Sequence, residues 1–260
     1  MTPALDPRTN TALWASLLAG LSTAIGALPI LFVRAPTPTQ ISAMLGFGAG
    51  VMIAAAAFTL VDGSFDLLAG LGTAVAVGWV ACGMLLGAGF LWLADHLLPH
   101  EHFVKGHDGP HTRFVRGAWL FVFAITLHNV PEGLAVGIGF AGPEQGLGHA
   151  ITSGIVLQNL PEGLIAATSL QAAGFRCGRS LAIAMATGLA EIAGGLLGIL
   201  LGQASVVVIA VAMTFAAGAM LYVVGQEVIP ESHVRGRERV ATWGIVIGFL
   251  VMTVLDRCLT

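Results

Sequence analysis

Residues 128–134 read HNVPEGL and residues 158–164 read QNLPEGL, so one motif occurs twice within a short part of the chain. Each copy places a glutamate and a proline, Pro131–Glu132 and Pro161–Glu162, inside an otherwise uncharged apolar segment. A carboxylate at the centre of a bilayer costs roughly 2.5–3.5 kcal/mol, and a proline removes a helix hydrogen bond. Because the costs of the carboxylate and of the proline are both repeated, the two copies indicate that these residues bind something polar.

The composition around these motifs is that of an integral membrane protein. Hydrophobic residues make up 56% of the 260 residues and charged residues only 10%, whereas soluble domains contain about 25% charged residues. A formal charge of −3 without a basic tract gives no indication of a nucleic-acid partner. The three cysteines are isolated and predict neither a disulfide framework nor a thiolate metal site.

Long apolar runs follow one another along the whole chain, and each is long enough for a helix to cross a bilayer, which takes about 20 residues. We therefore expect an all-α membrane protein with eight transmembrane helices in a single domain, 1–260. Asp62 and Asp66 separate the second span from the third, and residues 95–116 form the one substantial loop, which is charged and rich in histidine. The predicted spans are about 9–33, 35–61, 67–94, 117–142, 147–175, 181–202, 206–228 and 240–255.

Lysine and arginine are distributed unequally between the two sides of this layout. Loops after odd-numbered spans hold nine of them, and the opposite side holds only Arg8 and Arg257. Since cytoplasmic loops carry the excess of positive charge, we expect a multi-pass protein of the cell membrane with both termini extracytoplasmic and the 95–116 loop in the cytoplasm. Trp243 lies near a predicted span end, where tryptophan is favoured.

The polar residues of each motif are spaced to share one face of a helix. Residues four apart point in the same direction, so His128 lies beside Glu132, and Gln158 lies beside Glu162. Asparagines at 129 and 159 precede the glutamates by three residues and reach the same side at another angle. Each motif therefore offers a carboxylate together with nitrogen or oxygen donors.

The prolines and glycines of the motifs predict a local distortion. Pro131 and Pro161 cannot donate to the carbonyl one turn earlier, so each is expected to kink its helix and free an acceptor. Gly133 and Gly163 are expected to leave room beside the carboxylates.

The two motifs lie on consecutive spans, which run in opposite directions. They are therefore related by an approximate two-fold axis in the membrane plane, and broken, pseudo-symmetric helices at the midplane are typical of a transporter binding site. Glu191 adds a third carboxylate at similar depth in the sixth span. The candidate metal ligands are His128, Asn129, Glu132, Gln158, Asn159, Glu162 and Glu191.

This set of donors favours particular metals. Nitrogen and oxygen without sulfur favour Zn²⁺, Fe²⁺ or Mn²⁺ over Cu⁺, and an imidazole argues against a dedicated Ca²⁺ or Mg²⁺ site. In this interpretation a divalent cation, with Zn²⁺ the first choice and Cd²⁺ a further candidate, is the transported substrate, and no catalytic cofactor is expected.

With HNVPEG in the fourth span and QNLPEG in the fifth, the chain resembles the ZIP (Zrt/Irt-like protein) family of divalent metal transporters, in its prokaryotic GufA-like branch. The resemblance extends along nearly the whole chain. It implies a metal site built from the seven candidate ligands, with Glu132 and Glu162 bridging two ions. It also implies a homodimer and an elevator-like motion of spans 1, 4, 5 and 6 against the other four. Some relatives carry an acid at the position of Asn159, so a second ion would be held here by less charge.

Further polar residues lie outside the motifs. The loop histidines could accept metal leaving the pore or form an ordinary solvated loop, and these alternatives stay open; they are His96, His100, His102, His107 and His111. Glu227, Glu231, His233 and Asp256 lie near span ends, where the favoured interpretation is that charged groups reach the membrane interface. An accessory metal site at Glu227 is the alternative.

The functional hypothesis is therefore a transporter that moves divalent metal into the cytoplasm, not an enzyme. The rival hypothesis is an intramembrane metal-dependent hydrolase in which His128 and Glu132 hold a metal-bound water. The matched second motif argues against the hydrolase, since such a site needs only one set of ligands and an open position.

Overall fold

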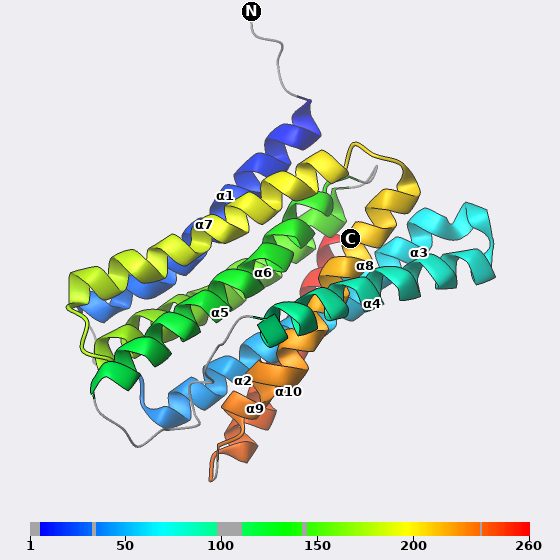
Figure 1. Cartoon of the computed structure of the whole chain (residues 1–260). Coiled ribbons are helices and arrows are strands. Elements are labelled where there is room, and N and C mark those ends of the chain that lie inside the picture. Colours follow the sequence, from blue (N-terminus) through cyan, green and yellow to red (C-terminus); the bar gives the residue numbers. More distant parts are fainter. Residues whose placement is uncertain (1–5, 33–34, 98–110, 142–144, 235) are drawn as a thin grey trace, which may run out of the picture.

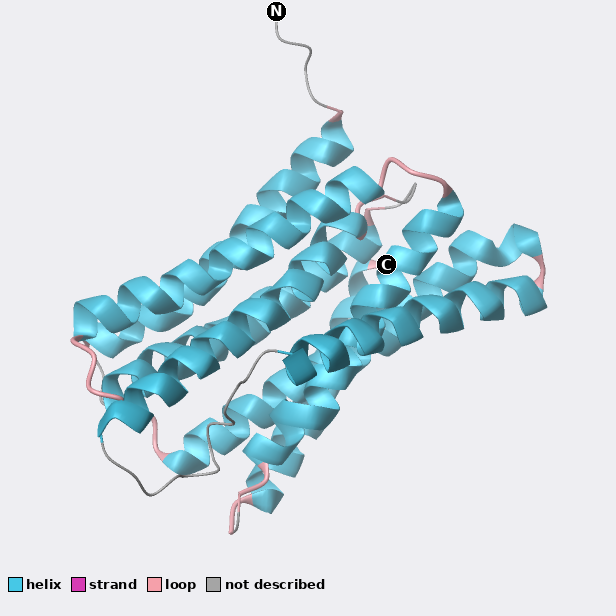
Figure 2. Cartoon of the chain, in the orientation of Figure 1, coloured by secondary structure: helices cyan, strands magenta, loops and turns pink. Residues whose placement is uncertain are grey.

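The structure is a computed structural model that describes residues 6–32, 35–97, 111–141, 145–234 and 236–260. Within these residues it is a bundle of long helices without β-strands (Figure 2). The α-helices are α1 (Pro7–Ala27), α2 (Pro38–Ala54), α3 (Asp62–Leu68), α4 (Thr73–Leu97), α5 (His111–Ile138), α6 (Gly146–Ala172), α7 (Cys177–Leu201), α8 (Val206–Val223), α9 (Ile229–Ser232) and α10 (Glu238–Leu259).

Several of these helices join end to end. A π-helical segment, Ala55–Val61, links α2 to α3, and a second one, Val224–Val228, links α8 to α9. Short 3₁₀ turns extend α1 to Leu31 and α3 to Leu71. The described residues thus form eight helical rods, six of which are long and apolar enough to cross a membrane: Pro7–Leu31, Pro38–Leu71, Thr73–Ala94, Cys177–Leu201, Val206–Ser232 and Glu238–Leu259.

The second rod is longer than the sequence predicted. Instead of ending at Val61, it continues through Asp62 and Asp66. No proline interrupts this stretch, and the two exposed aspartates lie four residues apart on one face while Ser64 and Leu68 are buried on the other. The rod ends near Gly72, whose φ of 83° belongs to the left-handed region that glycine tolerates.

Local sequence signals explain where the helices begin. Thr37 caps α2: its hydroxyl accepts from the Gln40 backbone N–H at 3.3 Å, while the Gln40 side chain accepts from the Thr37 N–H at 2.8 Å. This reciprocal capping box satisfies two backbone donors that a helix start leaves unpaired. Pro38 follows at the first helical position, where its missing N–H costs nothing.

The rods form two groups that lie side by side (Figure 1). One, which we call the site bundle, consists of α1, α5, α6 and α7, each packed on the others. The other, the frame bundle, pairs α2 with α10 and α4 with α8. The bundles meet mainly where α5 contacts α8 and where α6 contacts α2 and α10.

Glycines allow the closest backbone approaches inside each bundle. A Cβ at Gly194 or Gly198 of α7 would meet the backbone of α5, and one at Gly83 or Gly87 of α4 would meet α8. Glycines spaced by four residues therefore bring these helix backbones into close contact. Between the bundles, Gly154 of α6 faces the flexible side chain of Met252, whereas a Cβ at Gly146, at the start of α6, would meet the backbone of Leu259 at the end of α10.

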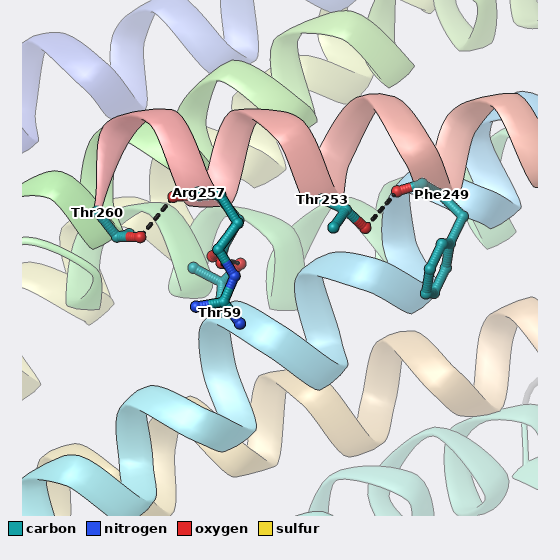
Figure 3. Close-up of polar contacts among 6 residues, drawn as sticks. Thr59, Phe249, Thr253, Arg257 and Thr260 are labelled. Carbon is teal, nitrogen blue, oxygen red and sulfur yellow. Dashed lines mark hydrogen bonds and ion pairs between the residues drawn. The ribbon is translucent and has the colours of Figure 1, made fainter.

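Thr59 lies beside the end of α10 (Figure 3), where that helix holds a buried acid, Asp256. Thr59, in the π-helical segment after α2, donates to the Asp256 carboxylate at 2.9 Å, and Asp256 is only 4% exposed. The sequence favours a carboxylate that reaches the membrane interface, whereas the Asp256 carboxylate is buried against Thr59. The widened π-helical turn brings a hydroxyl donor to the carboxylate, which can then remain inside the protein.

The outer surface of the rods is strongly apolar. Large side chains point outward along the described helices, including Trp14, Leu85, Trp92 and Leu250, each more than half exposed. Polar groups such as Asn129, Glu132 and Glu191 are almost fully buried. This arrangement suits a protein surrounded by lipid.

Candidate metal centre

The two sequence motifs lie on neighbouring helices of the site bundle, His128–Gly133 on α5 and Gln158–Gly163 on α6. Pro131 and Pro161 are interior to these helices, and the helical assignment is continuous through both. The kink that the sequence predicts at each proline stays a prediction. The helices nevertheless bring both motifs against the frame bundle.

Four motif side chains line a pocket of about 70 Å³ between the two bundles. We call them the pocket layer; they are His128, Glu132, Gln158 and Glu162. The opposite wall belongs to the frame bundle, with Met44 and Met52 from α2 and with Glu227 and Glu231 from the end of the α8 rod. The pocket therefore combines three kinds of nitrogen and oxygen donor with apolar walls.

Within the pocket layer, each motif is held by a partner. The Gln158 amide donates to Glu132 Oε1 at 2.5 Å, which links α6 to α5. His128 Nε2 lies 3.3 Å from Glu227 Oε1, and both of these side chains are only slightly exposed, at 13% and 12%. The second contact crosses from the site bundle to the frame bundle.

Three further candidates lie behind this layer, in what we call the rear layer: Asn129, Asn159 and Glu191. The Asn159 amide nitrogen lies 2.9 and 2.8 Å from the two Glu191 oxygens and 3.1 Å from the Ala19 carbonyl oxygen of α1. The Asn129 amide donates to the Thr187 carbonyl of α7 at 3.1 Å. None of the three belongs to the pocket lining, and all are fully buried.

Several motif oxygens have no hydrogen-bond partner among the described residues. Six buried side-chain polar atoms of the described chain share this property, and four of them belong to the motifs: Asn129 Oδ1, Glu132 Oε2, Gln158 Oε1 and Asn159 Oδ1. All four are acceptors. Leaving a buried acceptor unpaired costs about 1–3 kcal/mol, so each of these oxygens favours a cation or a proton donor as its neighbour.

The pocket-layer donors face one space without converging on one point. Among the described residues, no group of three or more His, Cys, Asp or Glu side chains is close enough to hold a metal ion. The contacts above explain the spread, because His128 is drawn to Glu227 and Glu132 to Gln158. A cation that binds His128 through Nε2 would compete with the Glu227 contact.

Gly133 and Gly163 have a different role from the one the sequence predicts. A Cβ at Gly133 would collide with the Glu191 backbone on α7, and one at Gly163 with the Thr23 backbone on α1. The missing side chains therefore allow the helices to touch, rather than leaving room beside the carboxylates. This contact also sets the depth of Glu191 relative to the first motif.

Two frame-bundle acids were underestimated from sequence. The sequence favours an interfacial position for both Glu227 and Glu231, with an accessory metal site at Glu227 as the alternative, yet both line the pocket. They are four residues apart and share a helical face. The four-residue spacing is the sequence signal that could have identified this pair. The length of the apolar segment does not show how deep in the membrane the two acids lie.

The loop histidines contribute little to the described structure. His96 lies at the end of α4, where its ring stacks on Trp92 with centroids 5.9 Å apart. His100, His102 and His107 lie outside the described residues, as does the side chain of His111. Whether this loop binds metal stays a prediction.

Comparison with known proteins gives consistent matches. The family described as ZIP Zinc transporter matches residues 100–256. The chain is 43% identical over 252 residues to "Zinc transporter GufA" of Myxococcus xanthus, an alignment that covers 96% of this chain and 99% of the relative. It is 43% identical over 249 residues to "Zinc transporter ZIPB" of Bordetella bronchiseptica, covering 92% and 78%. "Zinc transporter ZIP11" of Homo sapiens is 29% identical over 317 residues, covering 90% and 93%.

Proposed function

Because this chain belongs to the ZIP family of zinc transporters, we propose that it carries Zn²⁺ across a membrane through the pocket between its two bundles. It is a multi-pass membrane protein, and its role is metal transport rather than catalysis. The metal is substrate and not cofactor. Fe²⁺, Mn²⁺ and Cd²⁺ are further candidate substrates, since the same nitrogen and oxygen donors accept them.

The pocket layer is the proposed cation site. His128 supplies an imidazole nitrogen, Glu132 and Glu162 supply carboxylate oxygens, and Gln158 supplies its amide oxygen. The observation that carries this proposal is the set of unpaired buried acceptors, above all Glu132 Oε2 and Gln158 Oε1. Zinc prefers four such ligands at about 2.0–2.2 Å, and a bound ion would satisfy oxygens that otherwise remain costly.

Binding requires a small rearrangement that also involves the frame bundle. Since His128 lies against Glu227, an arriving cation competes with that contact for the imidazole. Glu227 and Glu231 then offer carboxylates on the opposite wall of the pocket. These two acids are the proposed accessory positions through which the ion passes between the site and one side of the membrane.

We propose a single ion in the site rather than the bridged pair that the family resemblance implies. Asn159 already occupies both Glu191 oxygens with its amide nitrogen. An amide nitrogen donates hydrogen bonds and has no lone pair for a metal, and the unpaired Oδ1 atoms of Asn129 and Asn159 belong to residues outside the pocket lining. We therefore propose that the rear layer is a hydrogen-bonded support. Such outer partners orient the residues that touch the metal.

The proposed movement is that of the site bundle against the frame bundle. Support comes from the packing, since close backbone contacts at glycine bind α5 to α7 and α4 to α8. The pocket lies along the boundary between the bundles. An elevator-like motion would carry the pocket layer past Glu227, and the lysine and arginine bias favours delivery to the cytoplasm. The homodimer and the cell-membrane location remain predictions.

Flux and hydrolysis separate this function from the rival one. Purified protein in sealed liposomes should accumulate Zn²⁺ with saturable kinetics, while the same preparation in detergent should not hydrolyse peptide or lipid substrates. Hydrolysis without zinc flux would contradict the proposal. Zinc flux that rises linearly with zinc concentration, without saturation, would indicate that the protein is a channel and not a carrier.

A further inference from the structure

Another concave feature lies on the outer face of α2 and α10. The groove has a volume of about 350 Å³ and an almost wholly apolar lining. It is lined by Ala43 and Phe47 of α2 and by Arg239, Val240, Trp243, Gly244 and Ile247 of α10. None of these residues takes part in the metal site described above.

The shape of the groove follows from close helix packing at its floor. A Cβ at Gly244 would meet the backbone of Ala43 and Phe47, so the two helices touch there. Trp243 and Ile247 stand beside this contact as walls and are 66% and 51% exposed. The result is a narrow slot with a glycine floor and large apolar sides.

The slot runs along α10 and ends at a cation. Arg239, Trp243 and Ile247 are spaced by four residues and share a helical face, so the slot extends along about 12 Å of helix. Among the described residues, no ion pair involves Arg239. The neighbouring Glu238 carboxylate instead accepts the Gly236 N–H at 3.1 and 2.9 Å.

An apolar slot that ends in an unpaired cation at the end of a membrane-spanning helix fits one class of ligand. Acyl chains match the apolar walls, the indole of Trp243 suits the headgroup region, and a negative headgroup complements Arg239. A zwitterionic headgroup would place its own positive charge near Arg239 and would therefore bind there less favourably than an anionic headgroup. We propose that the groove binds one anionic phospholipid, with its headgroup on Arg239 and an acyl chain along Trp243 and Ile247.

Quenching of tryptophan fluorescence by brominated lipids tests this proposal. The protein is placed in phosphatidylcholine nanodiscs containing increasing fractions of either brominated phosphatidylglycerol or brominated phosphatidylcholine. The contribution of Trp243 is the difference between the wild type and Trp243→Phe. One arginine near the surface is worth about 1 kcal/mol for an anionic lipid, so half-maximal quenching should need about fivefold less phosphatidylglycerol than phosphatidylcholine.

Three arginine variants provide the controls. Arg239→Gln should abolish the preference, and Arg239→Lys should keep it, which excludes simple misfolding. Arg179→Gln removes another exposed arginine, one that lies over the Phe175 ring and outside the groove, and should change nothing. Equal quenching by both lipids, or an unchanged preference in Arg239→Gln, would overturn the proposal. The proposal would also be overturned if neither brominated lipid quenched the fluorescence of Trp243, as expected if a second copy of the chain covers the groove.

Discussion

The pocket layer and the rear layer both contain residues of the two motifs, and Glu191 of α7 completes the rear layer, yet their surroundings differ. Glu132 of the pocket layer keeps one carboxylate oxygen without a partner among the described residues, while both oxygens of Glu191 in the rear layer face one amide. The difference arises because Asn159 points toward α1 and α7, whereas Gln158, its neighbour in sequence, points into the pocket. In the proposed function, one of these adjacent residues of α6 binds the cation and the other supports the site.

Removal of a pocket-layer acid should have the largest effect. Glu162→Ala or Glu132→Ala deletes a charged ligand, so zinc uptake into liposomes should fall to the background of empty vesicles. Glu238→Ala is the matched control, because this glutamate is exposed and bonds only locally to Gly236. Normal uptake by either pocket-layer variant would refute the assignment.

Removal of the rear-layer charge should have a smaller effect of a different kind. Glu191→Gln keeps a side chain that can bond Asn159, so zinc affinity should fall by roughly tenfold to a hundredfold, the usual result for an outer partner. Titration of the purified protein against a zinc-sensitive dye would measure this. A complete loss of binding, equal to that of Glu162→Ala, would mean that both layers hold the metal.

Asn159→Asp should convert the rear layer into a second site. The new carboxylate would face Glu191 without an amide proton between them, and two facing carboxylates favour a cation. Equilibrium dialysis should find one zinc per chain in the wild type and two in the variant. Asn129→Asp is the control, since Asn129 faces a backbone carbonyl, and should keep one zinc. Two ions in the wild type would contradict the single-ion proposal, and no bound zinc would contradict the transport site itself.

The smallest expected effect concerns the close contact between Gly133 of α5 and the Glu191 backbone of α7. Gly133→Ala pushes a methyl group into the Glu191 backbone, and overpacking of this kind costs about 1–3 kcal/mol. The melting temperature should fall by on the order of 5 °C. Gly78→Ala, where a Cβ meets nothing within 4 Å, should keep or slightly raise it. Equal behaviour of the two variants would show that this contact does not matter.

Parts of this arrangement were readable from the sequence, and the reasons are physical. Glu132 and Glu162 stood out because a carboxylate is costly in an apolar helix, and long apolar runs predicted the helical rods. Helical spacing brought His128 and Glu132 to one face, and both line the pocket. Local periodicity alone was sufficient for these predictions.

The remaining features depend on contacts between distant segments. Asp256 is buried because Thr59 of another rod donates a hydrogen bond to it. The charged residue Asp62 was expected to end the second span, but the helix continues through it. The division of the candidate ligands into two layers depends on α1 and α7. The Ala19 carbonyl of α1 accepts from Asn159, and the Thr187 carbonyl of α7 accepts from Asn129. Spacing along one helix does not reveal which neighbour each side chain meets.

The most direct test of the cation site is an anomalous difference map from zinc-soaked crystals, recorded on both sides of the zinc absorption edge. We predict one peak per chain in the pocket between the bundles, about 2.0–2.2 Å from His128 and from oxygens of Glu132 and Glu162. A principal peak between Asn159 and Glu191, or none near α5 and α6, would contradict it.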